Sequence, residues 1–268
     1  MARTGTPAWI DLGTHPIDDA VSFYSQAFGW TVPEGNPEFG GYRMAESGGA
    51  PVAGMMSSLM GPDGEADEPQ YPTWWTVYLA VEDCASATRA AVAAGGSIAV
   101  PTMEIAGLGA MAVVMDPSGA AVGLWEGREF GGVEFTGQPG SPVWFELMTT
   151  DFDAASPFYQ QVFGWQLAYM GEDGEATEGA ADSGIRYATN FPGDQASAGI
   201  CEAGSFLPEA VPSFWRAYLG VADTDQAIET ITGLGGAVTD GPMDSPFGRV
   251  ATVEDPQGGM FQIVSVSR

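Results

Sequence analysis

The alternation of apolar and polar residues predicts a strand followed by a helix near the start of the chain. Apolar and polar positions alternate over 8–12, which is typical of a strand with one buried face. Asp18 can cap a helix, whose apolar residues then recur at helical spacing until Gly29 ends it. Three short strand-like stretches punctuated by Gly and Pro follow, around 30–33, 40–46 and 51–57. The pattern over this region is therefore βαβββ.

The same order recurs from residue 74. A strand runs to Val81, and a helix from about Asp83 to Ala94 ends at a pair of glycines. Three further strands are predicted near 97–104, 110–116 and 120–126. Residues 1–126 thus contain two βαβββ modules.

The second half of the chain repeats the first. The segment AWIDLGTHPIDDAVSFYSQAFGW (8–30) aligns without a gap with VWFELMTTDFDAASPFYQQVFGW (143–165), and WWTVYLAVED (74–83) aligns with FWRAYLGVAD (214–223). A repeat of this length indicates duplication. The Gly/Pro-rich segment 127–142 is the predicted linker, so we expect one domain over 1–126 and another over 143–268. The chain is predicted to be α+β, with four βαβββ modules.

The composition and the net charge exclude several classes of binding partner. The chain has 268 residues, of which 45% are hydrophobic, enough for a packed core. Its 35 acidic and 8 basic residues give a net charge of −27, which repels nucleic acids and anionic membranes. It contains no apolar run long enough to span a membrane and no secretory signal, so we expect a cytoplasmic protein. The sequence leaves open whether it is a monomer or a homodimer. Cys84 and Cys201 lie in different copies and are interpreted as reduced core residues.

The double βαβββ order resembles the vicinal-oxygen-chelate family of glyoxalase I, bleomycin-resistance proteins, fosfomycin-modifying enzymes and extradiol dioxygenases. The resemblance is carried by DDAVSFYSQAFGW and DAASPFYQQVFGW, which are similar to the family's first helix, and by the DPSG and EDPQG turns before the final strands. It implies that paired modules curl into half-open barrels, so that four modules make two clefts. Because this fold hosts many activities, it does not define a function by itself.

The resemblance also implies a divalent cation in each cleft, held by His, Glu or Gln at fixed places. In this chain those places hold Trp9, about Gly54, Thr76 and Gly123 in the first copy, and Trp144, about Gly199, Arg216 and Gln262 in the second. Only Gln262 could ligate a cation, and Arg216 would repel one. A shift of two residues along the strands would bring Asp11, Glu146 or Tyr218 forward, but carboxylates alone make a thin site. We therefore expect no metal and no other cofactor.

The family's cleft-facing positions are instead rich in aromatic residues. Side chains alternate along a strand, so Trp9 shares a face with Asp11, and Trp144 with Glu146. The predicted ligand-binding residues are Trp9, Trp74, Thr76, Tyr78, Trp125, Trp144, Phe214, Arg216, Tyr218 and Gln262. Asp11 and Glu146 are candidates for polar anchors or for a general acid and base. Filling of the barrel core is the alternative interpretation for any one of the aromatic residues.

These features favour a metal-free protein that sequesters a hydrophobic or aromatic small molecule, and the acidic surface would suit a cationic one. The alternative is a glyoxalase-like lyase, isomerase, cyclase or oxygenase of secondary metabolism that uses Asp11 or Glu146 in catalysis. A regulatory module with vestigial clefts is a third possibility. The single histidine, His15, precedes the first helix and is interpreted as a surface residue, because the second copy has Thr150 there.

Overall fold

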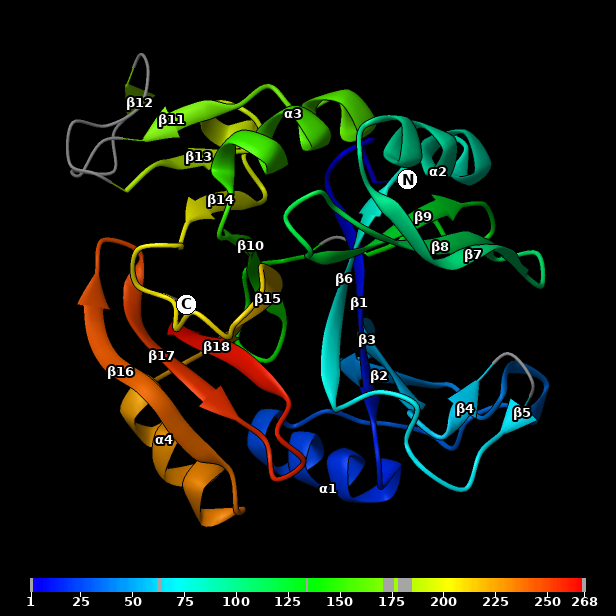
Figure 1. Ribbon diagram of the computed structural model, residues 1–268. Coiled ribbons are helices and arrows are strands. Elements are labelled where there is room, and N and C mark those ends of the chain that lie inside the picture. The colour runs from blue at the N-terminus through cyan, green and yellow to red at the C-terminus, as the bar shows by residue number, and fades with distance from the viewer. Residues whose placement is uncertain (1, 62–63, 134, 171–175, 178–184, 267–268) are drawn as a thin grey trace. The chain divides into compact units, whose positions relative to one another are not determined.

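The computed structural model describes residues 2–61, 64–133, 135–170, 176–177 and 185–266 (Figure 1). The elements of the first copy are β1 (Pro7–Thr14), α1 (Ile17–Phe28), β2 (Arg43–Ser47), β3 (Ala50–Ser57), β4 (Met60–Gly61), β5 (Gly64–Glu65), β6 (Trp74–Ala80), α2 (Cys84–Ala93), β7 (Ser97–Ile105), β8 (Gly109–Met115) and β9 (Ala121–Gly127). Those of the second are β10 (Pro142–Thr149), α3 (Phe152–Phe163), β11 (Ala168–Met170), β12 (Ala176–Thr177), β13 (Tyr187–Thr189), β14 (Gly199–Glu202), β15 (Phe214–Val221), α4 (Thr224–Gly233), β16 (Ala237–Ser245), β17 (Gly248–Glu254) and β18 (Met260–Ser265).

The strands of each copy form one large sheet, except that β4 and β5 pair only with each other. The first sheet has the order β2-β3-β1-β6-β9-β8-β7, and the second β12-β11-β13-β14-β10-β15-β18-β17-β16. In each module the first strand pairs in parallel with a later one: β1 with β3, β6 with β9, β10 with β14, and β15 with β18. The predicted α+β chain of four modules is confirmed. The strand expected at 30–33 is reduced to a single bridge between Thr31 and Glu46.

The helix ends follow local chemistry, with one correction. Gly29 ends α1 in the left-handed conformation at φ 71°, which favours glycine. Asp83 caps α2 by accepting a hydrogen bond from the Ser86 backbone N–H. The prediction that Asp18 caps α1 is wrong, because Pro16 is the capping residue. Asp18 instead lies in the first turn, where its charge suits the helix dipole and pairs with Arg43 at 2.7 Å.

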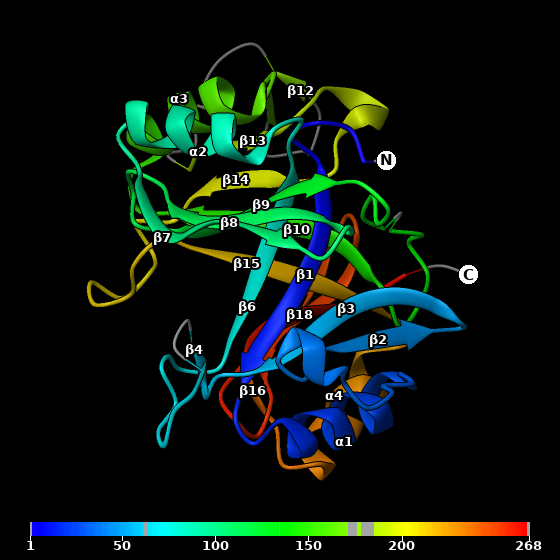
Figure 2. The ribbon, with the colours of Figure 1, turned by 90° about the vertical axis from the view of Figure 1, so that its right-hand side faces the viewer.

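The compact units of the molecule combine parts of both copies. Unit 1 consists of residues 1–9, 77–134 and 144–216, and unit 2 of residues 10–76, 135–143 and 217–268. Within unit 1, α2 packs beside α3, and within unit 2, α1 packs beside α4 (Figures 1 and 2). Unit 1 therefore joins the second and third modules, and unit 2 the first and fourth. Among the described residues no helix is both long and apolar enough to cross a membrane.

A buried tyrosine holds each unit together across the two copies. In unit 1 the Tyr159 hydroxyl donates to Asp116 Oδ2 at 2.9 Å and accepts from Trp215 Nε1 at 2.8 Å. Its ring stacks on Trp165, with the ring centroids 4.8 Å apart. Tyr159 comes from the third module and Asp116 from the second, so this hydrogen bond links the copies.

The same arrangement recurs in unit 2. The Tyr24 hydroxyl donates to Asp255 Oδ2 at 2.8 Å and accepts from Trp75 Nε1 at 3.2 Å. The Tyr24 ring stacks on Trp30 and lies 5.6 Å from the ring of Phe261. These contacts explain why both copies contain the motif FY followed by FGW: its tyrosine and tryptophan form the core of each unit.

Because Asp255 is buried, its carboxyl should make stability fall as the pH rises. Burial raises the pKa of Asp255, despite the hydrogen bonds from Gly259 and Tyr24 that favour the charged form. The folded state therefore holds the proton more tightly, and the stability from this group is present below the ordinary Asp pKa and lost as the pH rises through the raised one. Urea unfolding of the native protein and of Asp255→Asn, from about pH 3 to about pH 7, should show the native protein's advantage shrinking with pH.

Asp153 supplies a control, because its contribution to stability changes with pH in the opposite direction to that of Asp255. The hydrogen bond from Arg186 holds the pKa of Asp153 below its usual range, so its contribution is lost as the pH falls. The advantage of the native protein over Asp153→Asn should therefore grow with pH in the acidic part of that range, up to about pH 5, and then stay constant. An advantage over Asp255→Asn that also grows with pH would contradict the prediction.

Candidate functional site

An ion pair in unit 1 joins two of the predicted site residues. Glu146 lies on β10 and Arg216 on β15, and Arg216 Nε donates to Glu146 Oε2 at 2.8 Å while Nη2 donates to the same oxygen. The Glu146 side chain is 7% exposed and that of Arg216 23% exposed. The guanidinium therefore offsets a buried negative charge and still reaches the surface. This Glu146 oxygen accepts from two donors, which suits an anchor better than a general base.

The strand β15 shows which face of this sheet is open. Phe214, Arg216 and Tyr218 are half-buried, whereas Trp215 and Ala217 are buried, so exposure alternates along the strand. The open side is the one that the sequence assigned to the cleft. On β10, Trp144 is also half-buried, and its Nε1 donates to the Tyr187 hydroxyl at 3.1 Å.

Tyr187 covers a glycine at a place where the family carries a metal ligand. Gly199 lies opposite Glu146 in the parallel pair of β10 and β14. A Cβ added at Gly199 would overlap the Tyr187 hydroxyl, so the tyrosine occupies the space of a side chain. Burial and then the charge of Glu146 raise the pKa of the nearby Cys201 thiol to about 12, so this thiol is neutral at physiological pH.

Two glycines of the first copy are covered in the same way. In unit 2, Gly54 lies opposite Asp11, and a Cβ added at Gly54 would overlap the Tyr42 hydroxyl. In unit 1, Gly123 lies opposite Tyr78, whose own ring covers it. The counterpart in the second copy is Gln262, opposite Tyr218.

These strand pairings favour the row of candidate metal-ligand positions that is shifted by two residues along the first strand of each module. The residues level with positions 54, 123, 199 and 262 are Asp11, Tyr78, Glu146 and Tyr218, in place of Trp9, Thr76, Trp144 and Arg216. Gln262, 2% exposed, donates from Nε2 to Thr252 Oγ1 at 2.8 Å. Even the shifted row offers at most one carboxylate in each copy.

The divalent cation implied by the fold does not fit these residues. Three of the four strand positions level with this row are glycines covered by tyrosine rings, and Glu146 is bound to a cation already, the guanidinium of Arg216. Throughout the described part of the chain, no three His, Cys, Asp or Glu side chains gather where they could hold a metal ion. Such cations require several oxygen or nitrogen ligands.

Two of the predicted aromatic residues are brought together around a residue of the linker. Trp9 and Trp125 both pack edge-on against Phe130, with ring centroids 5.2 Å and 6.0 Å from it, and Trp125 Nε1 donates to the Phe130 carbonyl at 3.0 Å. Trp9 is 5% exposed and Trp125 8%. Here the alternative interpretation, filling of the core, is favoured. Sequence reasoning missed Phe130 because it lies in the predicted linker.

The other predicted residues of the first copy differ in their exposure. Trp74 is 37% exposed at the start of β6, and Thr76 is half-buried on the same strand. Asp11 is half-buried, and its charge raises the pKa of Tyr71, after the larger effect of burial. His15 is exposed, in agreement with its interpretation as a surface residue.

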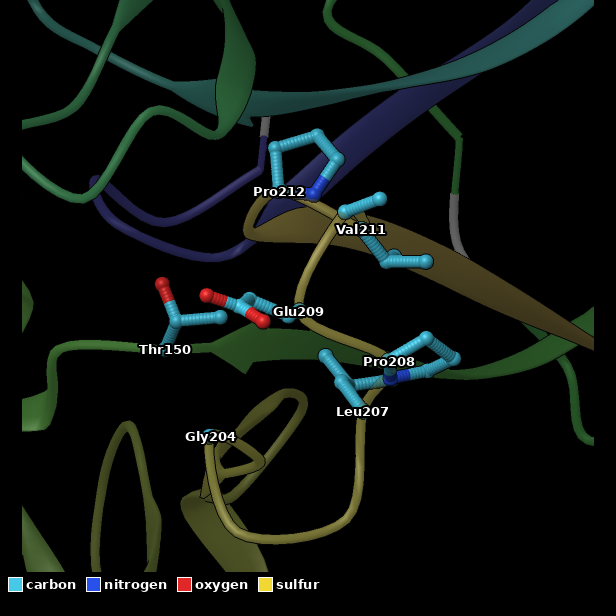
Figure 3. A pocket seen from close by; sticks show the side chains of 8 residues that line it. Thr150, Gly204, Leu207, Pro208, Glu209, Val211 and Pro212 are labelled. Carbon is cyan, nitrogen blue, oxygen red and sulfur yellow. The ribbon is translucent and has the colours of Figure 1, made fainter.

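A groove with a volume of about 420 Å³ lies in unit 1 at the end of β10 (Figure 3). It is lined by Thr150, Gly204, Leu207, Pro208, Glu209, Ala210, Val211 and Pro212. Figure 3 shows the Glu209 carboxylate pointing across the groove toward Thr150. None of the predicted binding residues lines this groove. The signal in the sequence was the apolar segment LPEAVP (207–212), which leads directly into β15.

The family follows from comparison with known proteins. The model of the Glyoxalase/Bleomycin resistance protein/Dioxygenase superfamily matches residues 6–124 and again 141–263, so the chain belongs to this superfamily in two copies. It is 35% identical over 274 residues to the anthracycline biosynthesis protein DnrV of Streptomyces peucetius, covering 98% of this chain and 94% of that protein.

Solved structures with the same fold are more distant in sequence. The 2,3-dioxygenase LapB from Pseudomonas sp. KL28 is 14% identical with a TM-score of 0.63, over 100% of this chain and 96% of that one. The Mn(II)-bound glyoxalase from Novosphingobium aromaticivorans is 16% identical with a TM-score of 0.59, over 99% and 83%. At these identities the likeness shows the fold alone.

Proposed function

We propose that the protein binds and sequesters a flat aromatic small molecule without the help of a metal ion. The observation that carries this proposal is the tyrosine cover over three glycines at the family's metal-ligand places. The three tyrosines fill the space of metal ligands, and two of them, Tyr42 and Tyr187, are half-buried and offer aromatic surface for stacking and apolar contact. The proposal includes no nucleic acid or membrane partner, because a net charge of −27 repels anionic surfaces, and it keeps the cytoplasmic location expected from the sequence.

The open face of β10 and β15 is the binding surface in this proposal. Trp144 and Phe214 offer half-buried aromatic rings there, and the ion pair with Glu146 holds Arg216, two residues after Phe214 on β15. A planar guanidinium can stack on an aromatic ligand and donate hydrogen bonds to its carbonyl or hydroxyl oxygens. Because Glu146 fixes Arg216 before binding, little side-chain entropy is lost.

The relationship to DnrV supports a ligand of this shape. That relative is named for anthracycline biosynthesis, and anthracyclines are flat polycyclic aromatic compounds. The likeness extends over nearly the whole of both chains, so it includes the strands of the proposed surface. We therefore propose a polycyclic aromatic ligand, such as a quinone with several fused rings.

Fluorescence titration with a neutral anthraquinone, 1-(4-hydroxybutylamino)anthraquinone, tests the proposal. We expect saturable quenching of tryptophan emission that is unchanged after the protein has been treated with EDTA. Trp144→Ala and Phe214→Ala should each weaken binding by about fivefold, because a lost aromatic contact costs about 1 kcal/mol. Phe247→Ala is the matched control, since Phe247 is 76% exposed on the turn between β16 and β17.

Two results would count against the proposal. If no saturable binding occurs to a folded protein, the aromatic face is not a binding surface. If EDTA abolishes binding, a metal ion takes part. Mass spectrometry of the recovered anthraquinone separates binding from catalysis, because the enzymatic alternative requires a change in mass or structure.

A further inference from the structure

The groove of Figure 3 adjoins the ends of the two strands that carry the proposed binding surface. Thr150 directly follows β10, four residues after Glu146, and Pro212 lies two residues before Phe214, the first residue of β15. The four residues from Glu146 to Thr150 span roughly 13 Å of extended chain. This distance is about the length of a molecule with three fused rings, so one ligand can extend from the Glu146–Arg216 ion pair to the groove.

The walls of the groove are apolar and its polar groups are few. Leu207, Val211 and the two prolines at 208 and 212 supply apolar surface from a single segment. Glu209 supplies a carboxylate, which Figure 3 shows directed across the opening toward the Thr150 side chain. Hydrogen bonds from Thr150 N to Ser213 Oγ at 2.9 Å, and between the two hydroxyl groups at 3.1 Å, hold this end of β10 against the start of β15.

We propose that this groove binds a positively charged amine arm carried by the aromatic ligand, with Glu209 as the counter-ion. This inference rests on the proposed function and deepens it, because it names the ligand class as a flat aromatic compound with a cationic side arm. The apolar walls would contact the carbon atoms of the arm, and the carboxylate would accept hydrogen bonds from its ammonium group.

The charge of the whole molecule supports a cationic arm. A net charge of −27 raises the local concentration of cations at every surface and repels anions. Two arginines of unit 1 pair with other carboxylates and so do not neutralise the charge of Glu209. Arg186 pairs with Glu202 and Asp153, and Arg216 pairs with Glu146. An amine is therefore the charge type that complements this groove.

A matched pair of ligands separates the amine contribution from aromatic binding. The compounds are 1-(4-aminobutylamino)anthraquinone and the neutral hydroxybutyl analogue used above. At low salt we expect the amine to bind about two- to fivefold more tightly to the native protein, which is the range for an exposed ion pair. This advantage should shrink as the salt concentration rises.

Two variants assign that advantage to the groove. Glu209→Gln should remove most of the amine's advantage and leave the affinity of the hydroxybutyl compound unchanged. Glu229→Gln changes the net charge equally at an exposed position on α4 and should leave the advantage intact. Circular dichroism should confirm that both variants are folded, as expected for changes of exposed side chains.

The outcomes are distinct for the two proposals. If neither compound binds, the proposed function fails and the inference fails with it. If both bind equally, or if Glu209→Gln and Glu229→Gln reduce the amine's advantage to the same extent, the aromatic surface stands and the amine site is overturned.

Discussion

Replacing Arg216 by alanine is expected to lower the free energy of unfolding by about 3 kcal/mol. The substitution leaves the carboxylate of Glu146, whose side chain is 7% exposed, without its guanidinium partner. A buried charge that loses its counter-ion costs more than the ion pair itself contributes, because the charge has already lost its hydration. Urea unfolding at neutral pH measures the change, and the slope of the transition should remain that of the native protein.

The cause can be isolated with a double-mutant cycle. Glu146→Gln in the Arg216→Ala background should restore part of the lost stability, since a neutral amide is cheaper to bury than a carboxylate. Glu146→Gln alone should cost less than Arg216→Ala, because the remaining guanidinium is 23% exposed and can be hydrated. If the two single changes simply added, the pair would not be coupled and this account would be wrong.

Residues 1–126 expressed alone are expected not to persist as a folded monomer. In the full chain, α1 of this segment packs in unit 2 with residues 217–268. Without them, Tyr24 would lose its acceptor Asp255 and its aromatic neighbour Phe261, and its ring would be left against water. The cost of exposing this aromatic surface is several kcal/mol, comparable with the whole stability of a small domain.

Self-association would relieve this exposure. Asp116 lies in the DPSG turn, the counterpart of the turn that holds Asp255, so a second copy of the segment could supply an acceptor for Tyr24. Size-exclusion chromatography with light scattering should therefore find a dimer or larger species. Co-expression of 143–268 should convert it into a one-to-one complex. A stable monomer of 1–126 would contradict the packing described for unit 2.

The repeat made much of the fold predictable from the sequence. The strand periodicity, the glycine at the end of α1 and the DPSG turn all depend on local geometry, so they can be recognised without knowledge of the rest of the chain. The exchange of modules between copies could not be recognised in this way. Each copy contains both the tyrosine and the aspartate of the buried hydrogen bond, so pairing within a copy and pairing between copies satisfy the sequence equally well.

The sequence predicted which face of a strand each site residue lies on, but it did not predict which side chains are in contact. Strand alternation placed Phe214, Arg216 and Tyr218 on one side, and their exposure agrees. Which partner Arg216 takes depends on the distance between two side chains from different strands, and the pattern of one strand carries no such information. The groove depends on how the segment LPEAVP folds back beside Thr150, which is a property of a loop.

The exchange of modules also explains where the two copies have been able to diverge. A change at Tyr24, Trp75 or their counterparts would disturb a core that both copies share. Each copy therefore limits which substitutions the other can accept at these core positions. The open strand faces are not part of a shared core, so they can differ between the copies. At matching positions there, one copy has Thr76 and the other has Arg216. Duplication of this kind leaves one inherited framework with two surfaces that selection can alter separately.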